Sequence, residues 1–254
     1  GLSDRASALW ASIGQKRGER REGRSASKDL LIQFRPDSIF AEQYRSIRTS
    51  LLFAMEESDR RAIAVTSPMP QDGKTATACN LAASLAQAGK RVVIIDADLR
   101  KPRVHMVFRI SNLNGLTKFL MGDLPWADLP RATPLPTLFV VNAGALPSDP
   151  LELLGSERLT TLVLQLKKDF DFVIVDTPPA LAVSDALVVG SRLDAAIMVV
   201  RRGKTPREAL KRAQEKLEAH MIRNIGVVIN AVRWRDLDEY QVSSYYRHRR
   251  QPDG

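Results

Sequence analysis

A Gly-Lys-Thr sequence at residues 73–75 has the residue types that bind nucleotide phosphates. It follows a short apolar run at residues 63–65, typical of a buried strand, and opens a stretch of small residues that predicts a helix as far as residue 88. Strand, loop and helix in this order are the context of a phosphate-binding loop. There, backbone N–H groups point at phosphate oxygens, a lysine reaches the β- and γ-phosphates, and a threonine hydroxyl ligates Mg²⁺.

The match to the phosphate-loop pattern is imperfect. The pattern places a glycine five residues before Gly73, and this sequence has Pro68 there. Gln71 and Asp72 stand where glycine fits a tight loop most easily. A Gly-Lys-Thr at a helix start also arises by chance, so the loop needs support from other segments. The predicted nucleotide-binding residues of the loop are Pro70, Gln71, Asp72, Gly73, Lys74, Thr75 and Ala76.

Three aspartates supply that support. Asp96 and Asp98 follow an apolar run that begins at residue 92, and Asp176 ends a second run that begins at residue 172. The carboxyl ends of parallel strands meet at one edge of a sheet, where phosphate-loop proteins need a carboxylate for Mg²⁺ or its water. Helix capping would explain one such aspartate. Three of them beside a Gly-Lys-Thr loop favour binding of Mg²⁺ and a nucleoside triphosphate.

Apolar runs alternate with amphipathic segments along the chain. Strands are expected at residues 63–65, 92–96, 138–141, 172–176, 195–200 and 225–230, and helices at 42–55, 73–88, 150–168, 185–191 and 205–220. This alternation predicts an α/β fold with a doubly wound, mainly parallel sheet flanked by helices, as in the P-loop NTPases. Ligands of such sheets bind at the carboxyl ends of the strands.

Composition divides the 254 residues into three parts. Residues 1–35 carry eight basic and four acidic side chains and predict a flexible basic segment, residues 36–235 form the phosphate-loop domain, and residues 236–254 form a polar tail. The basic segment suits a solvated linker as well as contact with anionic lipid or nucleic acid. A nucleic-acid binder fits less well, because no recognition motif is present and aromatic residues make up only 6%.

The remaining composition is that of a globular protein in a reducing compartment. Hydrophobic residues make up 44% of the chain and the formal net charge is +9. The single cysteine, Cys79, excludes an intramolecular disulfide and lies on the apolar side of the predicted loop helix, where packing explains it. No window reaches the roughly 18 consecutive apolar residues of a transmembrane helix.

These motifs resemble the cytoplasmic kinase domain of the bacterial tyrosine kinases of exopolysaccharide and capsule assembly, in the deviant Walker group of P-loop ATPases. The resemblance covers about residues 36–250. Lys74 and Thr75 match the end of the family's Walker A motif, Asp96 and Asp98 its Walker A′ motif, and Asp176 its Walker B motif. Further matching segments lie at residues 42–48, 98–102, 114–116, 150–154, 176–185 and 201–205.

The resemblance implies an ATP-dependent protein-tyrosine autokinase with Mg²⁺ as cofactor. Lys74 would neutralise charge developing on the γ-phosphoryl group, and Asp96 would accept the proton of the tyrosine hydroxyl. Positioning and electrostatics dominate this reaction, so no covalent intermediate is required. The implied Mg²⁺-binding residues are Thr75, Asp98 and Asp176, the last acting through water.

The implied phosphate acceptors are in the tail. Tyr240, Tyr245 and Tyr246 are three of only four tyrosines, and a polar, basic sequence surrounds them. Tyrosines of a hydrophobic core rarely gather on such a tail, so we expect them to be phosphorylated in trans by a neighbouring subunit. Asn230, at the end of the last predicted strand, either hydrogen-bonds the adenine edge or only ends the strand.

The resemblance also implies partners. Glu42, Arg45 and Arg48 match a Glu-x-x-Arg-x-x-Arg helix associated in the family with ring-like self-association, although their spacing also suits an intrahelical surface pair. A membrane polysaccharide co-polymerase segment, fused upstream or separate, would activate the kinase at the cytoplasmic face of the bacterial inner membrane. A cognate tyrosine phosphatase is expected to reverse the modification.

Two other classes remain open. A partitioning or positioning ATPase of the same group would use ATP to switch between monomer and dimer, but those proteins carry a lysine near the start of the loop, where this chain has Pro68. A nucleotide-binding regulatory subunit would explain the motifs if Gln71 and Asp72 prevent transfer. The eukaryotic kinase fold is excluded, because its Gly-rich loop, His-Arg-Asp and Asp-Phe-Gly motifs are missing.

Overall fold

A seven-stranded sheet organises the chain in the computed structural model, which describes residues 30, 38–55 and 62–232. The strands are β1 (Ala62–Thr66), β2 (Val92–Asp96), β3 (Arg131–Ala132), β4 (Leu138–Val141), β5 (Phe172–Asp176), β6 (Ala195–Arg201) and β7 (Asn224–Asn230). Their order across the sheet is β3-β4-β2-β5-β1-β6-β7, and every pairing is parallel except that of β3 with β4. The predicted doubly wound, mainly parallel sheet is confirmed.

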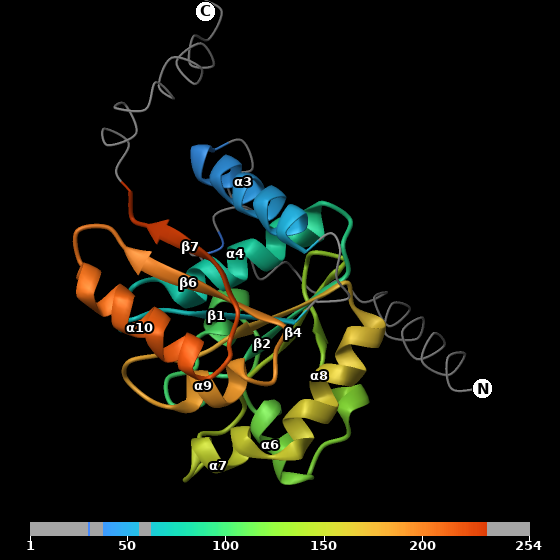
Figure 1. Cartoon of the computed structure of the whole chain (residues 1–254). Coiled ribbons are helices and arrows are strands. Elements are labelled where there is room, and N and C mark those ends of the chain that lie inside the picture. Colours follow the sequence, from blue (N-terminus) through green and yellow to red (C-terminus); the bar gives the residue numbers. More distant parts are fainter. Residues whose placement is uncertain (1–29, 31–37, 56–61, 233–254) are drawn as a thin grey trace, which may run out of the picture.

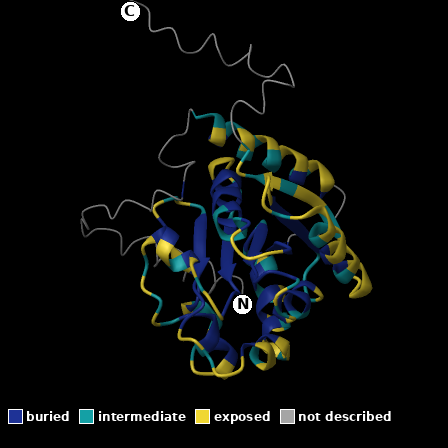
Figure 2. Ribbon diagram, turned by 90° about the vertical axis from the view of Figure 1, so that its left-hand side faces the viewer, coloured by how far each residue is buried: buried dark blue, intermediate teal, exposed yellow. Residues whose placement is uncertain are grey.

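The central strands consist mainly of apolar residues because both faces of the sheet are covered. Every residue of β1, β2, β4 and β5 is buried, as expected for a parallel sheet between two helical layers. Figure 2 shows these strands buried in the middle of the molecule, with exposed residues on the outer helices and at one sheet edge. That edge is β7, whose residues are partly buried or exposed, and the two residues of β3 at the opposite edge are exposed as well.

Three helices cover one face of the sheet (Figure 1). They are α3 (Ile39–Ala54), α4 (Lys74–Gln87) and α5 (Val104–Phe108). The helix α4 follows the Gly-Lys-Thr loop and consists mainly of small residues, so it lies close to the strands and is buried from Thr77 to Ala86. Cys79 is buried within it, as its packing role predicts.

The remaining helices cover the opposite face. They are α6 (Leu116–Met121), α7 (Pro150–Gly155), α8 (Glu157–Asp169), α9 (Asp185–Gly190) and α10 (Arg207–Ala219), and a short 3-10 turn lies at Trp126–Asp128. Alternate strand residues contribute to the two layers: Val92 and Ile94 pack toward α4, whereas Val93 and Ile95 pack toward α6 to α9. No helix in the described ranges is long and apolar enough to cross a membrane.

The structure differs from the sequence-based expectation in two places. The helix expected at residues 150–168 is two helices, because Ser156 has extended backbone angles (φ −70°, ψ 150°) between α7 and α8. The strand β3 was not predicted, since two residues give no periodicity. The tyrosines of the predicted tail, and the basic segment at residues 1–35 apart from Leu30, lie outside the described residues.

Candidate active site

The strand order brings the predicted functional residues to one edge of the sheet. Strand β5 lies between β1 and β2, so the loop that follows β1 is next to the ends of both acidic strands. Asp96 and Asp176 are register partners on β2 and β5, at the same level of the sheet. All the predicted carboxylates and the Gly-Lys-Thr loop therefore converge at the carboxyl ends of the strands, where ligands of such sheets bind.

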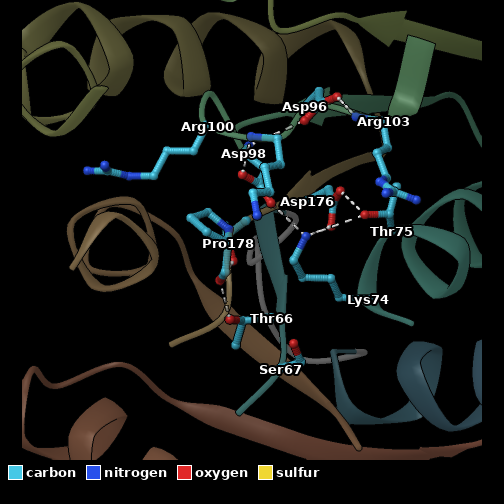
Figure 3. Close-up of polar contacts among 12 residues, drawn as sticks. Thr66, Ser67, Lys74, Thr75, Asp96, Asp98, Arg100, Arg103, Asp176 and Pro178 are labelled. Carbon is cyan, nitrogen blue, oxygen red and sulfur yellow. Dashed lines mark hydrogen bonds and ion pairs between the residues drawn. The ribbon is translucent and has the colours of Figure 1, made fainter. Parts of the chain in front are cut away.

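Lys74, the first residue of α4, lies among these carboxylates (Figure 3). Its Nζ donates to Asp98 Oδ2 at 2.8 Å and lies 3.8 Å from Asp176 Oδ1. Burial lowers the pKa of this lysine, but the carboxylates of Asp176 and Asp98 outweigh that effect and raise the pKa overall. Lys74 is therefore charged at neutral pH. The two carboxylates that contact it come from the ends of β2 and β5, outside the Gly-Lys-Thr loop.

Thr75 and Asp176 form the second contact of the loop with the sheet. The Thr75 hydroxyl donates to Asp176 Oδ2 at 2.6 Å (Figure 3). Asp176 is fully buried, and its Oδ1 accepts no hydrogen bond among the described residues. Burial raises the pKa of this carboxyl, an effect that Lys74 and Thr75 partly offset.

This geometry fits Mg²⁺, which prefers oxygen ligands and usually takes one or two carboxylates together with waters and substrate phosphates. A buried carboxylate oxygen without a donor, beside a threonine hydroxyl, is such a ligand set. Within the described part of the chain no three acidic, histidine or cysteine side chains form a cage for a metal ion. The protein therefore supplies only some of the ligands for Mg²⁺, and phosphate oxygens would complete the coordination. Its protein ligands would come from Thr75, Asp98 and Asp176.

Asp96 has a different environment from the other two aspartates. Its Oδ2 accepts the N–H groups of Arg103 (3.0 Å) and Val104 (2.9 Å) at the start of α5, and its Oδ1 accepts the more distant N–H of Asp98 (3.3 Å). Burial and the neighbouring Asp176 raise the pKa of Asp96 to about 8. The side chain therefore orders the segment between β2 and α5, whatever else it does.

The raised pKa of Asp96 predicts a pH dependence of stability in metal-free buffer. An unfolded chain releases this proton near the ordinary pKa of about 4, whereas the folded protein keeps it until about pH 8. The free energy of unfolding should therefore fall as pH rises between these values, by up to about 1.4 kcal/mol per pH unit from this group. Asp96→Asn removes the titration but keeps an oxygen acceptor for the two α5 amides.

Urea unfolding at several pH values between 5 and 8, with EDTA, measures this slope. The Asp96→Asn protein should lose less stability over the range than the wild type. Asp123→Asn, at an exposed position, is the matched control and should keep the wild-type slope. Equal slopes for Asp96→Asn and the wild type would contradict the burial argument.

A cavity of about 650 Å³ opens beside these residues. This volume is within the range of small-molecule sites. One part of its wall is the loop, namely Pro70, Gln71, Gly73, Lys74, Thr75 and Ala76. The other part comes from the segments after β2 and β5, including Asp98, Arg100, Met106, Val107, Pro178 and Pro179. Six of the seven predicted loop residues thus line the cavity.

Two predicted nucleotide contacts are outside that lining. The Asp72 side chain is 3% exposed and accepts from Met69 N–H (3.0 Å) and from the Thr205 hydroxyl (2.7 Å). Asn230 donates through Nδ2 to the Asp72 carbonyl (3.0 Å) and accepts the Ala231 N–H through Oδ1 (2.8 Å). A contact of Asn230 with adenine remains a prediction, and both ends of its amide already have protein partners.

An ion pair that the sequence reasoning missed joins two walls of the cavity. Arg100 donates to Asp185 from Nε (2.7 Å) and from Nη2 (3.0 Å), and Asp185 is fully buried at the start of α9. Asp185 raises the pKa of the Arg100 guanidinium. Such a bidentate pair has a defined geometry, so it ties the segment after β2 to the segment after β5. An acidic residue that opens an otherwise apolar helix was the available signal.

The Glu-x-x-Arg-x-x-Arg helix is α3, and its two arginines have different environments. Arg45 pairs with Glu42 one turn away at 2.7 Å, with both side chains partly exposed. Arg48 donates to the Ser84 carbonyl of α4 at 3.0 Å. Within the subunit, Arg48 thus fixes α3 to the helix that carries Lys74. Self-association through either arginine remains a prediction.

Comparison with known proteins places this geometry in a family. A family model described as an AAA domain matches residues 61–201. Tyrosine-protein kinase YwqD of Bacillus subtilis is 37% identical over 86% of this chain and 92% of its own length. Tyrosine-protein kinase wzc of Salmonella typhimurium is 34% identical over 91% of this chain, which spans only 32% of that larger relative.

Solved structures agree with these relatives. The kinase domain of the Escherichia coli tyrosine kinase ETK superposes with a TM-score of 0.80 at 34% identity, over 86% of each chain. The cell division ATPase MinD of Pyrococcus furiosus reaches a TM-score of 0.59 at 23% identity over 66% of this chain and 71% of its own, which shows the shared fold alone. With its phosphate loop, strand-end aspartates and these relatives, the chain belongs to the family of bacterial tyrosine-protein kinases.

Proposed function

We propose that this chain is an ATP-dependent protein-tyrosine autokinase, which phosphorylates its own C-terminal tyrosines in trans and regulates polymerisation and export of an exopolysaccharide or capsule. One observation carries the proposal. Lys74, Thr75 and Asp98 line one cavity, and the buried Asp176 contacts Lys74 and Thr75 behind that wall, in a chain whose relatives are named tyrosine-protein kinases.

The loop and the aspartates divide the work of nucleotide binding. Mg·ATP, when bound, supplies the γ-phosphoryl group and a divalent charge. Thr75 and Asp176 would supply oxygen ligands to the cation, and Asp98, which accepts a hydrogen bond from Lys74, lines the cavity. The Lys74 ammonium offsets the negative charge that develops on the transferred group. No side chain has to form a covalent bond.

Asp96 is proposed as the acceptor of the tyrosine hydroxyl proton. Its raised pKa lies near the working pH, where a general base is most effective. Of its two oxygens, Oδ1 has only the 3.3 Å bond to Asp98 N–H and is the one that can accept a proton with least disturbance of α5. Asp96 itself is fully buried, and Asp98, two residues further along the chain, lines the cavity.

The apolar part of the cavity suits the ring of an acceptor tyrosine. Met106 and Val107 of α5 face the same cavity as Pro178 and Pro179 after β5. An aromatic ring binds well between aliphatic and proline side chains because it buries a large apolar area. We place the acceptor ring there, with its hydroxyl toward Lys74. The acceptors themselves, Tyr240, Tyr245 and Tyr246, lie outside the described residues.

Ring-like self-association through α3 is the second part of the proposal. Substitutions of its two arginines distinguish an effect on self-association from an effect on stability. Arg48→Met removes a bond to the Ser84 carbonyl and should lower the free energy of unfolding by about 1–2 kcal/mol. Arg45→Met removes a partly exposed pair and should cost less than about 0.5 kcal/mol.

Light scattering on both variants then tests the interface. Loss of oligomers in the Arg45→Met protein, with its unfolding curve unchanged, would support a direct contact between subunits. Oligomers of wild-type size in both variants would remove α3 from the proposed interface. Parallel unfolding curves identify any change in size that results only from lost stability.

Further partners follow from the proposed role in polysaccharide assembly. A membrane co-polymerase segment, separate or fused, would activate the kinase at the cytoplasmic face of the bacterial inner membrane. A cognate tyrosine phosphatase would remove the phosphates. The longer wzc relative, of which this chain spans about a third, has room for additional segments.

The test of the function is the intact mass of the full chain after incubation with Mg·ATP. A phosphate adds about 80 Da and nearly two negative charges to a tyrosine. Gains in steps of this size, located on peptides of residues 236–254, would establish the autokinase. ATP consumption without any gain in mass would favour the switch ATPase instead, and binding without turnover would favour the regulatory subunit.

A further inference from the structure

The phosphate loop of this chain has an unusual composition for its shape. Between β1 and Gly73 it contains two prolines and no glycine. Gln71 nevertheless has a left-handed backbone (φ 66°), as does Gly73 (φ 98°). A left-handed backbone disfavours any residue except glycine and, to a lesser degree, asparagine and aspartate. Contacts from outside the loop must therefore hold it in this shape.

Thr205 and the Asp72 carboxylate provide one such contact. Thr205 lies in the turn between β6 and α10, and its hydroxyl donates to Asp72 Oδ1 at 2.7 Å. The same hydroxyl accepts the Arg201 N–H at 2.8 Å, which fixes its orientation. The other oxygen of Asp72 accepts the Met69 N–H across the loop at 3.0 Å. The buried carboxylate thus ties both sides of the loop to the turn that follows β6.

Asn230 and Arg201 hold the backbone carbonyls of the same loop. Asn230 Nδ2 donates to the Asp72 carbonyl at 3.0 Å, and Arg201 Nη1 donates to the Gln71 carbonyl at 3.3 Å. The Asn230 amide nitrogen occupies the space beside Gly73, where a Cβ would lie only 1.9 Å from it. Both donors come from the ends of β6 and β7, away from the acidic strands.

Holding these carbonyls determines where the loop N–H groups point. In a planar trans peptide the C=O and the following N–H point in opposite directions. A carbonyl of Asp72 directed at Asn230 therefore turns the N–H of Gly73 away from β7, and the Gln71 carbonyl does the same for the N–H of Asp72. Successive N–H groups turned to one side form an anion-binding concavity, and Gly73 lines the cavity.

We propose that Thr205 is a positioning residue for phosphate binding, acting through Asp72, and that Asn230 acts in the same brace by orienting the Asp72–Gly73 peptide. Neither side chain needs to touch the nucleotide. Without the brace the left-handed residues of the loop relax, and the N–H groups no longer converge. The brace thus supplies the order that glycines supply in the usual loop. It concerns nucleotide affinity, so it holds whether or not tyrosine is the acceptor.

The first test is the affinity of the full chain for Mg·ADP, measured by calorimetry for three variants. Thr205→Val removes the hydroxyl and should weaken binding about tenfold, the loss expected for one hydrogen bond to a charged group. Thr205→Ser keeps the hydroxyl and should stay within about twofold of the wild type. Thr117→Val is the control, because it removes a buried hydroxyl of α6 that donates to the Ala143 carbonyl. Its affinity for Mg·ADP should also stay within about twofold of the wild type.

Two results would overturn the role of Thr205. One is wild-type affinity in Thr205→Val, and the other is an equal loss in Thr205→Ser or in the Thr117→Val control, which would indicate a general structural effect. Thermal unfolding without nucleotide is recorded for each variant, because a positioning role predicts a change in affinity that is larger than the change in stability explains.

A second test separates the brace from adenine recognition at Asn230. Mg·pyrophosphate carries the phosphates without a base. If Asn230 acts in the brace, Asn230→Ala should weaken binding of Mg·pyrophosphate and Mg·ADP by the same factor, about tenfold or more. Loss of affinity for Mg·ADP alone would overturn its place in the brace and favour a contact with adenine.

Discussion

Replacement of Lys74 by methionine is expected to lower the rate of phosphoryl transfer by about 10³-fold or more. The Nζ atom is the positive charge that lies within 4 Å of both Asp98 and Asp176. Its removal leaves two carboxylates facing the transferred group, so repulsion replaces attraction where negative charge develops. Methionine keeps the length and apolar stem of the side chain.

The rate is measured as phosphotyrosine formed over time with Mg·ATP in excess. Lys211→Met is the matched control, since Lys211 is an exposed lysine of α10 that forms a surface pair with Glu215, and its rate should equal that of the wild type. A Lys74→Met protein that transfers phosphate within tenfold of the wild type would show that another group supplies the charge. Circular dichroism of both variants identifies any loss of fold.

Changing Tyr240, Tyr245 and Tyr246 together to phenylalanine is expected to abolish phosphotyrosine while ATP binding is retained. Phenylalanine lacks the hydroxyl that receives the phosphoryl group but keeps the ring and its apolar area. The measurement is intact mass after incubation with Mg·ATP, followed by peptide mapping. Three of the four tyrosines are removed by this change. Phosphorylation of the fourth would show that the reaction is not selective for the tail.

That remaining tyrosine provides the control. Tyr44 lies on α3, where burial raises the pKa of its hydroxyl. Tyr44→Phe should therefore leave the phosphate content at the wild-type value. Full incorporation in the triple variant would reject the tail as acceptor, and incorporation lost in Tyr44→Phe would move the acceptor site to α3.

The elements that could be predicted best from the sequence were those whose residue types are determined mainly by burial. The strands β2 and β5 are continuous apolar runs because helices cover both sheet faces, so their positions were predicted closely. The aspartates that end them stood out because a charge directly after a buried strand is unusual. Such local signals were sufficient for the α/β fold and for the group of carboxylates.

Contacts between distant segments could not be predicted in this way. The pairing of Asp96 with Asp176 depends on the order β2-β5-β1, which no local pattern specifies. The bonds of Asp72 to Thr205 and of its carbonyl to Asn230 span 133 and 158 residues. From the sequence, Asp72 was only a departure from the loop pattern. In the structure its carboxylate accepts hydrogen bonds from Met69 N–H and from the Thr205 hydroxyl.

The burial of Asp96 and Asp176 side by side also makes the stability of this fold depend on whether the site is occupied by a ligand. Two neighbouring carboxyl groups without water cost folding free energy, and each responds by a raised pKa. A divalent cation held at the proposed ligand Asp176 would remove part of that cost, so it would bind the native state better than the unfolded chain. Ligand binding of this kind raises the melting temperature with the logarithm of ligand concentration. The rise in melting temperature with increasing concentrations of Mg²⁺ and nucleotide should therefore measure how strongly the ligand binds at these strand ends.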